Sequence, residues 1–121
     1  MMWIYQQSTG KLLRNGDLVG MGYSGHDAGV NNPLLESDHG IGPIPHGLWT
    51  IGAFYDDPHL GPCVAHLDPV PPNTAYGRTL FRIHGDNSAG DESASRGCII
   101  MNRLVRLAVK SSGDTSLQVI E

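Results

Sequence analysis

The sequence predicts a mainly β fold of short strands with a single helix near its C-terminus. Sixteen glycines and eight prolines in 121 residues place turn signals along the whole chain. Short apolar runs lie between these turns, and helical spacing is sustained in only one segment. We expect one domain over residues 1–121, because a chain of this length can bury one core and shows neither a linker nor an internal repeat.

The N-terminal third predicts a β-meander. Residues 2–7 and 11–14 flank a Ser-Thr-Gly turn, and an Asn-Gly turn separates the second run from a third at 17–23. Residues 24–42 are polar and rich in Gly and Asn, which indicates a surface loop with at most a short helical turn. This loop is either a lid over a cleft or an ordinary surface loop.

Further strands are expected at 48–51 and 61–67, and a proline-rich connection at 68–77 leads to a run at 78–85. If that last run is extended, alternate side chains point to opposite faces. Its residues then divide into one face with Phe81 and Ile83, and another with Leu80, Arg82 and His84.

The C-terminal region predicts the one substantial helix, over residues 103–110. Asn102 precedes it as a suitable N-cap, and Ser-Ser-Gly-Asp ends it. A closing strand is expected at 115–121. The apolar residues at helical spacing are Leu104, Leu107 and Ala108.

The formal net charge is −4, so no broad basic face for nucleic acid is expected. No apolar run is long enough to span a bilayer and no N-terminal signal pattern is visible, so we expect neither membrane insertion nor a signal peptide. The charges are unevenly distributed, since residues 15–77 hold seven acids and no Lys or Arg. Six of the eight basic residues lie in 78–110: Arg78, Arg82, Arg96, Arg103, Arg106 and Lys110.

This basic segment has two interpretations. One is solvated faces of a strand and a helix, and the other is a local field that attracts a substrate with a carboxylate.

The two cysteines, Cys63 and Cys98, allow one disulfide by count alone. We do not expect it, because a core of this size needs no covalent link and each cysteine has another explanation. Cys63, in LGPCVAHL, fits a small buried residue on a strand. Cys98 follows a polar loop that begins after His84.

A thiol attacks carbonyl carbon as the thiolate, and a neighbouring imidazole shifts the ionisation in that direction. His84 can supply the imidazole if the fold returns Cys98 to it, and Arg96 can add positive potential. The small residue before the thiol allows a tight turn, in which the N–H groups of Gly97 and Cys98 can face an oxyanion. Ser95 can brace this loop or donate a further hydrogen bond.

The segment IHGDN…SASRGCII resembles the signature of the L,D-transpeptidase (YkuD-type) family, in which a His-Gly on a strand is followed by Ser-X-Gly-Cys and aliphatic residues. GPIPHGLWTIG at 42–52 is similar to the start of a strand in that family. The strongest similarity is to small type VI secretion L,D-transpeptidase effectors, which share YSGH, NNP, GPIP, HLGP and IHGDN with this chain.

The resemblance implies a YkuD-like β-sandwich in which Cys98 is the nucleophile and His84 its base. It also implies oxyanion donors at Gly97 and Cys98, a place for Ser95 in the site, and the Gly85 carbonyl as the group that orients the imidazole.

Two positions depart from the family pattern. Arg96 stands where the family usually has His, and Ile100 where it often has Arg. Arg82 and Arg96 are therefore the candidates for holding a substrate carboxylate.

The implied substrate is the peptidoglycan stem tetrapeptide, attacked at the carbonyl of its third residue with release of the terminal D-alanine. Water, a D-amino acid or another stem would resolve the acyl-enzyme. The implied partners are a secretion apparatus and a cognate immunity protein, and the implied site of action is the periplasm of a target bacterium.

Alternatives remain open at this point. A non-catalytic cell-wall or partner-binding module on the same fold is favoured by Arg96 and Ile100. A papain-like Cys/His amidase fits less well, because there the Cys precedes the His in sequence. No cofactor or metal is expected, since the six histidines lack zinc-ligand spacing and the polar loop at 86–92 lacks that of a calcium loop.

Overall fold

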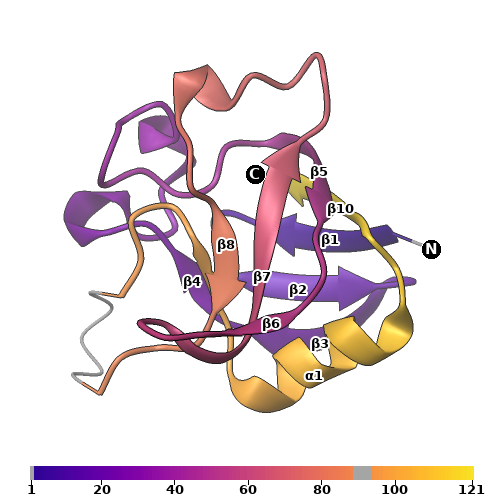
Figure 1. Cartoon of the computed structure of the whole chain (residues 1–121). Coiled ribbons are helices and arrows are strands. Elements are labelled where there is room, and N and C mark those ends of the chain that lie inside the picture. Colours follow the sequence, from indigo (N-terminus) through magenta and orange to yellow (C-terminus); the bar gives the residue numbers. More distant parts are fainter. Residues whose placement is uncertain (1, 89–93) are drawn as a thin grey trace.

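The computed structural model describes residues 2–88 and 94–121, and in them it shows a mainly β fold with one α-helix and no closed barrel (Figure 1). The predicted fold class is therefore confirmed. The strands are β1 (Met2–Gln6), β2 (Lys11–Arg14), β3 (Asp17–Met21), β4 (Tyr23–Ser24), β5 (Gly47–Ile51), β6 (Tyr55–Asp57), β7 (Gly61–Pro69), β8 (Arg82–His84), β9 (Ile99–Ile100) and β10 (Ser116–Ile120). The helical segments are the 3-10 turns η1 (Asp27–Gly29), η2 (Pro33–Leu35) and η3 (Ala75–Gly77), and the α-helix α1 (Arg103–Ser112).

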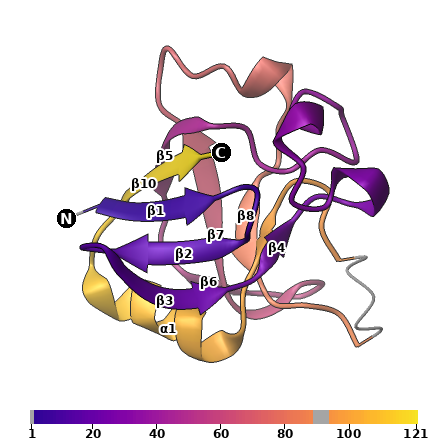
Figure 2. The ribbon, with the colours of Figure 1, turned by 180° about the vertical axis from the view of Figure 1, so that it is seen from behind.

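The strands form one long path in the order β3-β2-β1-β10-β5-β7-β8-β9-β4, and β6 pairs with β7 beside this path. The β1–β10 and β8–β9 pairs are parallel, and the remaining pairs are antiparallel. Figures 1 and 2 show that the path bends, so that β1, β2 and β3 lie behind β7 and β8. The meander and the strands that carry the His and Cys segments thus form two layers.

The main core lies between these two layers. Trp3 and Tyr5 of β1 are in one buried cluster with Ile83 of β8 and Ile99 of β9. Burial of such large apolar side chains is the main favourable term in folding. The core therefore fixes β8 and β9, and with them the residues that follow or precede each strand.

Helix α1 begins where predicted, with the Asn102 side chain accepting a hydrogen bond from the N–H of Val105. The prediction of which helix face is buried was wrong. Leu104 is 79% exposed, whereas Val105 and Val109 are buried. Arg106 is buried beside them, because backbone carbonyl groups satisfy its guanidinium. The buried face of α1 thus consists of Val105, Arg106 and Val109, and the predicted leucines lie outside it.

Strand β8 is shorter than the predicted run. Leu80 does not share a strand face with Arg82, because its φ of 66° breaks the extended backbone and its side chain is 71% exposed. Residues 24–42 form a loop with the short turns η1 and η2, as expected. The predicted polar loop at 86–92 lies partly outside the described residues, which end at 88 on this side.

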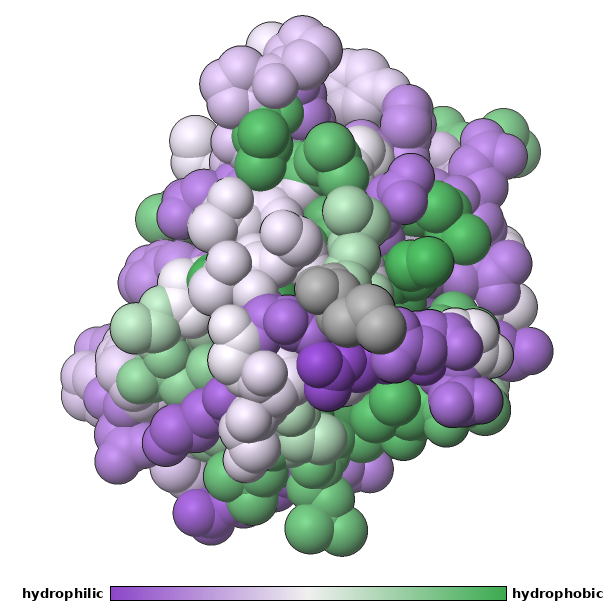
Figure 3. All heavy atoms as spheres, turned by 90° about the vertical axis from the view of Figure 1, so that its right-hand side faces the viewer, coloured by the Kyte–Doolittle hydropathy of each residue, from purple (hydrophilic) through white to green (hydrophobic). Residues whose placement is uncertain are grey.

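The face on the right of Figure 1 carries mostly hydrophilic side chains with separate apolar groups (Figure 3). One apolar group lies at the bottom of this face, at the level of α1 (Figure 3). Leu104 and Leu107 of α1 are among the exposed apolar residues. No helix among the described residues is long and apolar enough to cross a bilayer.

Candidate active site

Three neighbouring strands bring the candidate residues to one face of the sheet. His66 of β7 is opposite Arg82 of β8, and Ile83 is opposite Ile99 of β9. Cys98 directly precedes β9 and so continues the row of His66 and Arg82. Because side chains alternate along a strand, this row points away from the core that holds Ile83 and Ile99.

His84 lies in the next row of the same face, opposite Ile100 of β9. Ile100 is in turn opposite Tyr23 of β4, and Tyr23 packs in a small buried cluster with Cys98 and Ile100. His84 of β8 and Cys98, which directly precedes β9, are therefore diagonal neighbours in the register of these two parallel strands.

The Cys98 thiol is free and only 8% exposed. It donates a hydrogen bond to the carbonyl oxygen of Leu80, with a sulfur–oxygen distance of 3.7 Å. Burial raises the pKa of the Cys98 thiol, while the backbone N–H and the positive charge of Arg82 and the charge of Arg78 act in the opposite direction. The resting side chain is thus a neutral thiol near two cations.

The His84 imidazole is 3% exposed, and its Nδ1 lies 2.8 Å from the carbonyl oxygen of Gly85. A carbonyl only accepts, so Nδ1 carries the proton and Nε2 of the neutral ring has a free lone pair. Burial lowers the pKa of His84, and the charges of Arg82 and Arg106 lower it further against the effect of the Gly85 hydrogen bond. The Gly85 carbonyl therefore holds a neutral ring in the tautomer that a general base requires.

Among the described residues, no hydrogen bond joins Cys98 to His84. Each side chain is bonded to a backbone carbonyl instead, the thiol to Leu80 and the imidazole to Gly85. The fold has placed the two groups on one face of adjacent strands without closing the contact between them.

Ser95 braces the segment before the thiol. Its buried hydroxyl donates to the carbonyl of Cys98 at 2.6 Å and accepts from the N–H groups of Gly97 at 3.1 Å and Gly25 at 2.9 Å. The Gly97 N–H is therefore occupied by Ser95 in this structure. Of the two expected oxyanion donors, only the N–H of Cys98 is left for that role.

Gly97 is required by its surroundings. Its φ is 121°, and a Cβ atom there would lie 2.6 Å from Nη2 of Arg78 and 2.7 Å from Cε1 of Phe81. The glycine thus lets the backbone pass close to a buried guanidinium just before the thiol.

Two arginines of the basic segment, Arg78 and Arg106, are buried, so the solvated-face interpretation is wrong for them. Arg78 donates to the carbonyls of Glu36, Gly42, Pro43 and Arg96, and so ties the 24–42 loop to the segment before Cys98.

Arg106 likewise joins separate segments of backbone, here on the side of the site that holds His84. It donates to the carbonyls of Met101, Pro62 and Cys63. A Cβ atom at Gly85 would lie 2.8 Å from its Nη2, so the guanidinium packs directly against the turn after His84. Their bonds to carbonyls make both buried arginines structural.

The two arginines proposed for substrate binding occupy different places. Arg82 is half-buried in the row between His66 and Cys98. Arg96 is exposed, and its carbonyl accepts from Arg78.

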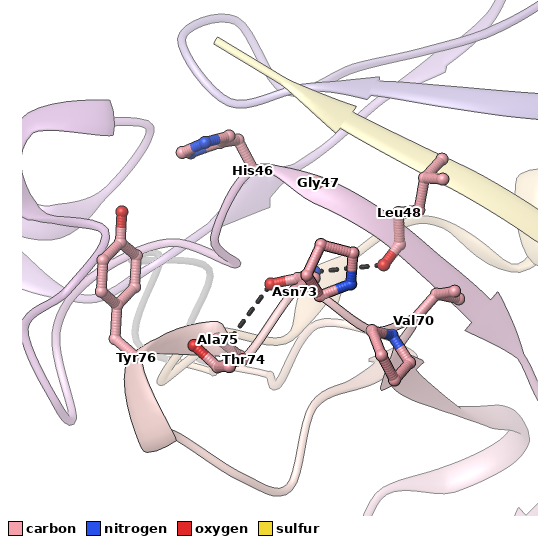
Figure 4. Close-up of a pocket in the computed structure, with 10 residues that line it drawn as sticks. His46, Gly47, Leu48, Val70, Asn73, Thr74, Ala75 and Tyr76 are labelled. Carbon is pink, nitrogen blue, oxygen red and sulfur yellow. Dashed lines mark hydrogen bonds between the residues drawn. The ribbon is translucent and has the colours of Figure 1, made fainter.

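Two hollows lie near this region. One of about 360 Å³ is lined by residues that include His66, Arg78 and Leu80, the last being the residue whose carbonyl accepts from the thiol. The other, of about 290 Å³, is lined by residues that include Tyr23, Asp86 and Ile100. A further hollow of about 380 Å³ lies between His46 and Tyr76 and is lined by none of the candidate site residues (Figure 4). In residues 2–88 and 94–121, no group of three or more His, Cys, Asp or Glu side chains is placed to hold a metal ion.

Residues of the β6–β7 hairpin at this site were missed from the sequence. The Tyr55 ring stacks on His66, with centroids 5.4 Å apart, and its hydroxyl donates to Asp57. The alternation of Tyr55 and Asp57 was a usable signal, but only the folded chain brings them close enough for the Arg82 charge to act on them.

Comparison with protein families identifies the chain. The model of the Tlde1 domain matches residues 19–116, which include the loop at 24–42 and every candidate site residue. The searches of curated proteins and of solved structures found no match. The chain belongs to the Tlde1 domain family, a family of type VI secretion effector domains.

Proposed function

We propose that this chain is a cysteine-dependent enzyme that modifies peptidoglycan stem peptides, with Cys98 as nucleophile and His84 as general base. The observation that carries the proposal is the placement of a free thiol and a neutral imidazole on one face of adjacent strands. The hydrogen bond to Gly85 leaves Nε2 of His84 free to take a proton.

The reaction begins with a small movement of the thiol. Rotation about the Cα–Cβ bond of Cys98 releases the sulfur from Leu80 and turns it toward His84, which then takes the thiol proton. Catalytic hydrogen bonds are often open in the absence of substrate and close when it binds. Burial disfavours the resulting charged pair at rest, so the thiolate forms chiefly when substrate is present.

The thiolate attacks the carbonyl carbon of the third stem residue, and the C–N bond to the terminal D-alanine breaks. The imidazolium of His84 returns its proton to the leaving amine, and a thioester on Cys98 remains. We assign the Cys98 N–H to the oxyanion, since Ser95 holds the Gly97 N–H. Arg82 and Arg96 are the candidates for the substrate carboxylate.

The acyl-enzyme is resolved by water, a free D-amino acid or the amine of another stem. These acceptors give L,D-carboxypeptidase activity, exchange and cross-linking respectively. For a member of an effector family we favour trimming and exchange, which would remove cross-linking donors from a rival cell wall. This role requires a secretion apparatus, action in the target periplasm and a cognate immunity protein in the producing cell.

The test is mass spectrometry of purified muropeptides incubated with the wild type, Cys98→Ala and the matched control Cys63→Ala. We expect tetrapeptides to lose a terminal alanine with the wild type and Cys63→Ala, and to stay intact with Cys98→Ala. Product formation by Cys98→Ala, or intact tetrapeptides after incubation with the wild type, would contradict the proposal.

A non-catalytic binding module is the second candidate. It is favoured by the buried thiol with a raised pKa and by the open Cys98–His84 contact. Alkylation of Cys98 by iodoacetamide separates the two candidates. Fast labelling of the wild type that becomes slower in His84→Ala supports the enzyme. Slow labelling that is the same in the wild type and in His84→Ala supports the binding module.

A further inference from the structure

The β6–β7 hairpin places a polar group of side chains beside the row of His66, Arg82 and Cys98. Tyr55 is opposite Val64 of β7 and leans onto the His66 ring at an interplanar angle of 8°. Its hydroxyl donates to Oδ2 of Asp57 at 3.0 Å and lies 3.2 Å from Nε2 of His66. Three side chains from two strands thus form one connected unit.

Arg82 is the next residue in this row. It pairs with His66 across the β7–β8 ladder, and Cys98 lies on its other side. Its Nε is buried and has no hydrogen-bond partner among the described residues. A half-buried guanidinium with an open donor needs neighbours that fix its position. His66 is opposite Arg82 on the neighbouring strand, and Tyr55 and Asp57 are close enough for the Arg82 charge to act on their ionisation.

We propose that Tyr55 and Asp57 are positioning residues that hold the Arg82 guanidinium beside the Cys98 thiol. This inference rests on the proposed function for its use in catalysis, but the arrangement itself concerns only the thiol and its neighbours. It assigns a task to the β6–β7 hairpin, which the proposed reaction does not otherwise use.

The charges support this arrangement. The pKa of the Asp57 carboxyl is lowered to about 2, first by the N–H groups of His59 and Leu60 and in smaller part by Arg82. The carboxylate therefore stays ionised at any pH at which the thiol titrates. Burial raises the pKa of both Tyr55 and Cys98, and the Arg82 side chain opposes the rise in each case, so it acts on both ends of the proposed chain of contacts.

Other charged and titratable groups face the thiol and must be kept constant in a test. His84 is on β8, Arg78 lies on the segment before β8, and Tyr23 lies on β4. The variants proposed below replace none of these groups. Asp57→Asn also removes a charge that raises the pKa of His84, so Tyr55→Phe, which changes no charge, is the variant that isolates the effect on Arg82.

The experiment measures the rate of Cys98 alkylation by iodoacetamide against pH, in a Cys63→Ala background so that only one thiol is labelled. Asp57→Asn removes the charge but keeps an oxygen for the N–H groups of His59 and Leu60, and Tyr55→Phe keeps the ring stacked on His66. Asp68→Asn is the matched control, since it removes an exposed carboxylate of β7 that is not among the groups shifting the Cys98 pKa.

We expect Asp57→Asn and Tyr55→Phe to move the labelling midpoint to higher pH and to slow labelling at neutral pH by roughly three- to tenfold. Asp68→Asn should match the background, and Arg82→Gln should show the largest shift. Wild-type midpoints in both Asp57→Asn and Tyr55→Phe would overturn the inference, as would a wild-type midpoint in Arg82→Gln.

This readout is independent of the muropeptide assay. A shifted midpoint together with intact muropeptides would leave the positioning role and remove the proposed function. An unshifted midpoint together with D-alanine release would support the proposed function and remove the positioning role. If one variant fails to fold, as judged by circular dichroism, the other still decides the outcome, because the two act on the same guanidinium.

Discussion

The surroundings of the two cysteines differ in one decisive respect. Cys63 and Cys98 are both free and buried, and each has a buried arginine nearby. Arg106 donates to the Cys63 carbonyl, while the positive charge of Arg78 acts on the Cys98 thiol. Burial and a nearby cation are therefore common to both sites.

Cys98 has a potential base on the same face of the sheet. His84 lies on the adjacent parallel strand with its Nε2 lone pair free, and Arg82 lies between the thiol and the β6–β7 hairpin. The backbone N–H of Cys63 instead donates to the carboxylate of Asp56. The comparison teaches that the placement of an imidazole, not burial or charge alone, is what separates a candidate nucleophile from a structural thiol.

The largest effect should come from replacing each thiol in turn. We expect Cys98→Ala to reduce D-alanine release at least about a thousandfold, because no other group can form the acyl-enzyme. Cys63→Ala should keep wild-type activity and lose roughly 1 kcal/mol of unfolding free energy. Chromatography of released D-alanine and urea denaturation provide the two measurements. Equal losses of activity in both variants would remove the distinction between the cysteines.

Replacing the imidazole should have the next largest effect. His84→Gln should lower D-alanine release by roughly 10²- to 10⁴-fold, because proton transfer from the thiol and to the leaving amine is lost. Initial rates measured across pH 5–9 check this, and the variant should also lose the wild-type pH dependence near neutrality. Retention of the wild-type rate and profile would mean that another group accepts the proton.

Replacing the two buried arginines tests whether both cysteine sites are stabilised by guanidinium–carbonyl hydrogen bonds. Arg78→Gln and Arg106→Gln should each lower the unfolding free energy by roughly 2–4 kcal/mol, since several buried carbonyls lose their donors. Urea denaturation gives these values. In addition, only Arg78→Gln should raise the pH midpoint of Cys98 alkylation directly. Unchanged stability in both variants would show that their carbonyl contacts are dispensable.

The smallest expected effect is on the pH dependence of stability. Because burial lowers the pKa of His84, the unfolded chain takes up a proton that the folded chain resists as the pH falls below about 6.5. Stability should therefore fall below that pH by up to about 1.4 kcal/mol per pH unit from this residue. Thermal unfolding between pH 5 and 7 measures it. A slope unchanged in His84→Gln would assign the acid sensitivity elsewhere.

The strand pattern of the sequence predicted part of the site. Alternation along residues 82–84 correctly placed Arg82 and His84 on one face, because the period of an extended strand is local information. The parallel pairing of β8 with β9, which places Cys98 beside Arg82, depends on contacts across the whole core and was beyond the sequence pattern.

Other features could not be predicted from the sequence. The sequence left Arg78 and Arg106 either on solvated faces or in a field for a substrate carboxylate, and neither interpretation included their burial, which depends on carbonyls from distant segments such as 42–43 and 62–63. The occupied Gly97 N–H depends on where the Ser95 hydroxyl lies, which is again a tertiary property.

The most direct test of the central claim is to trap the covalent intermediate. The protein is mixed with a tetrapeptide muropeptide, quenched in acid within seconds and measured by intact and peptide mass spectrometry. We predict an adduct with the mass of the substrate less D-alanine, located on the peptide that contains Cys98 and absent in Cys98→Ala. D-alanine release with no adduct on Cys98, or an adduct on another residue, would contradict the assignment of Cys98 as the nucleophile.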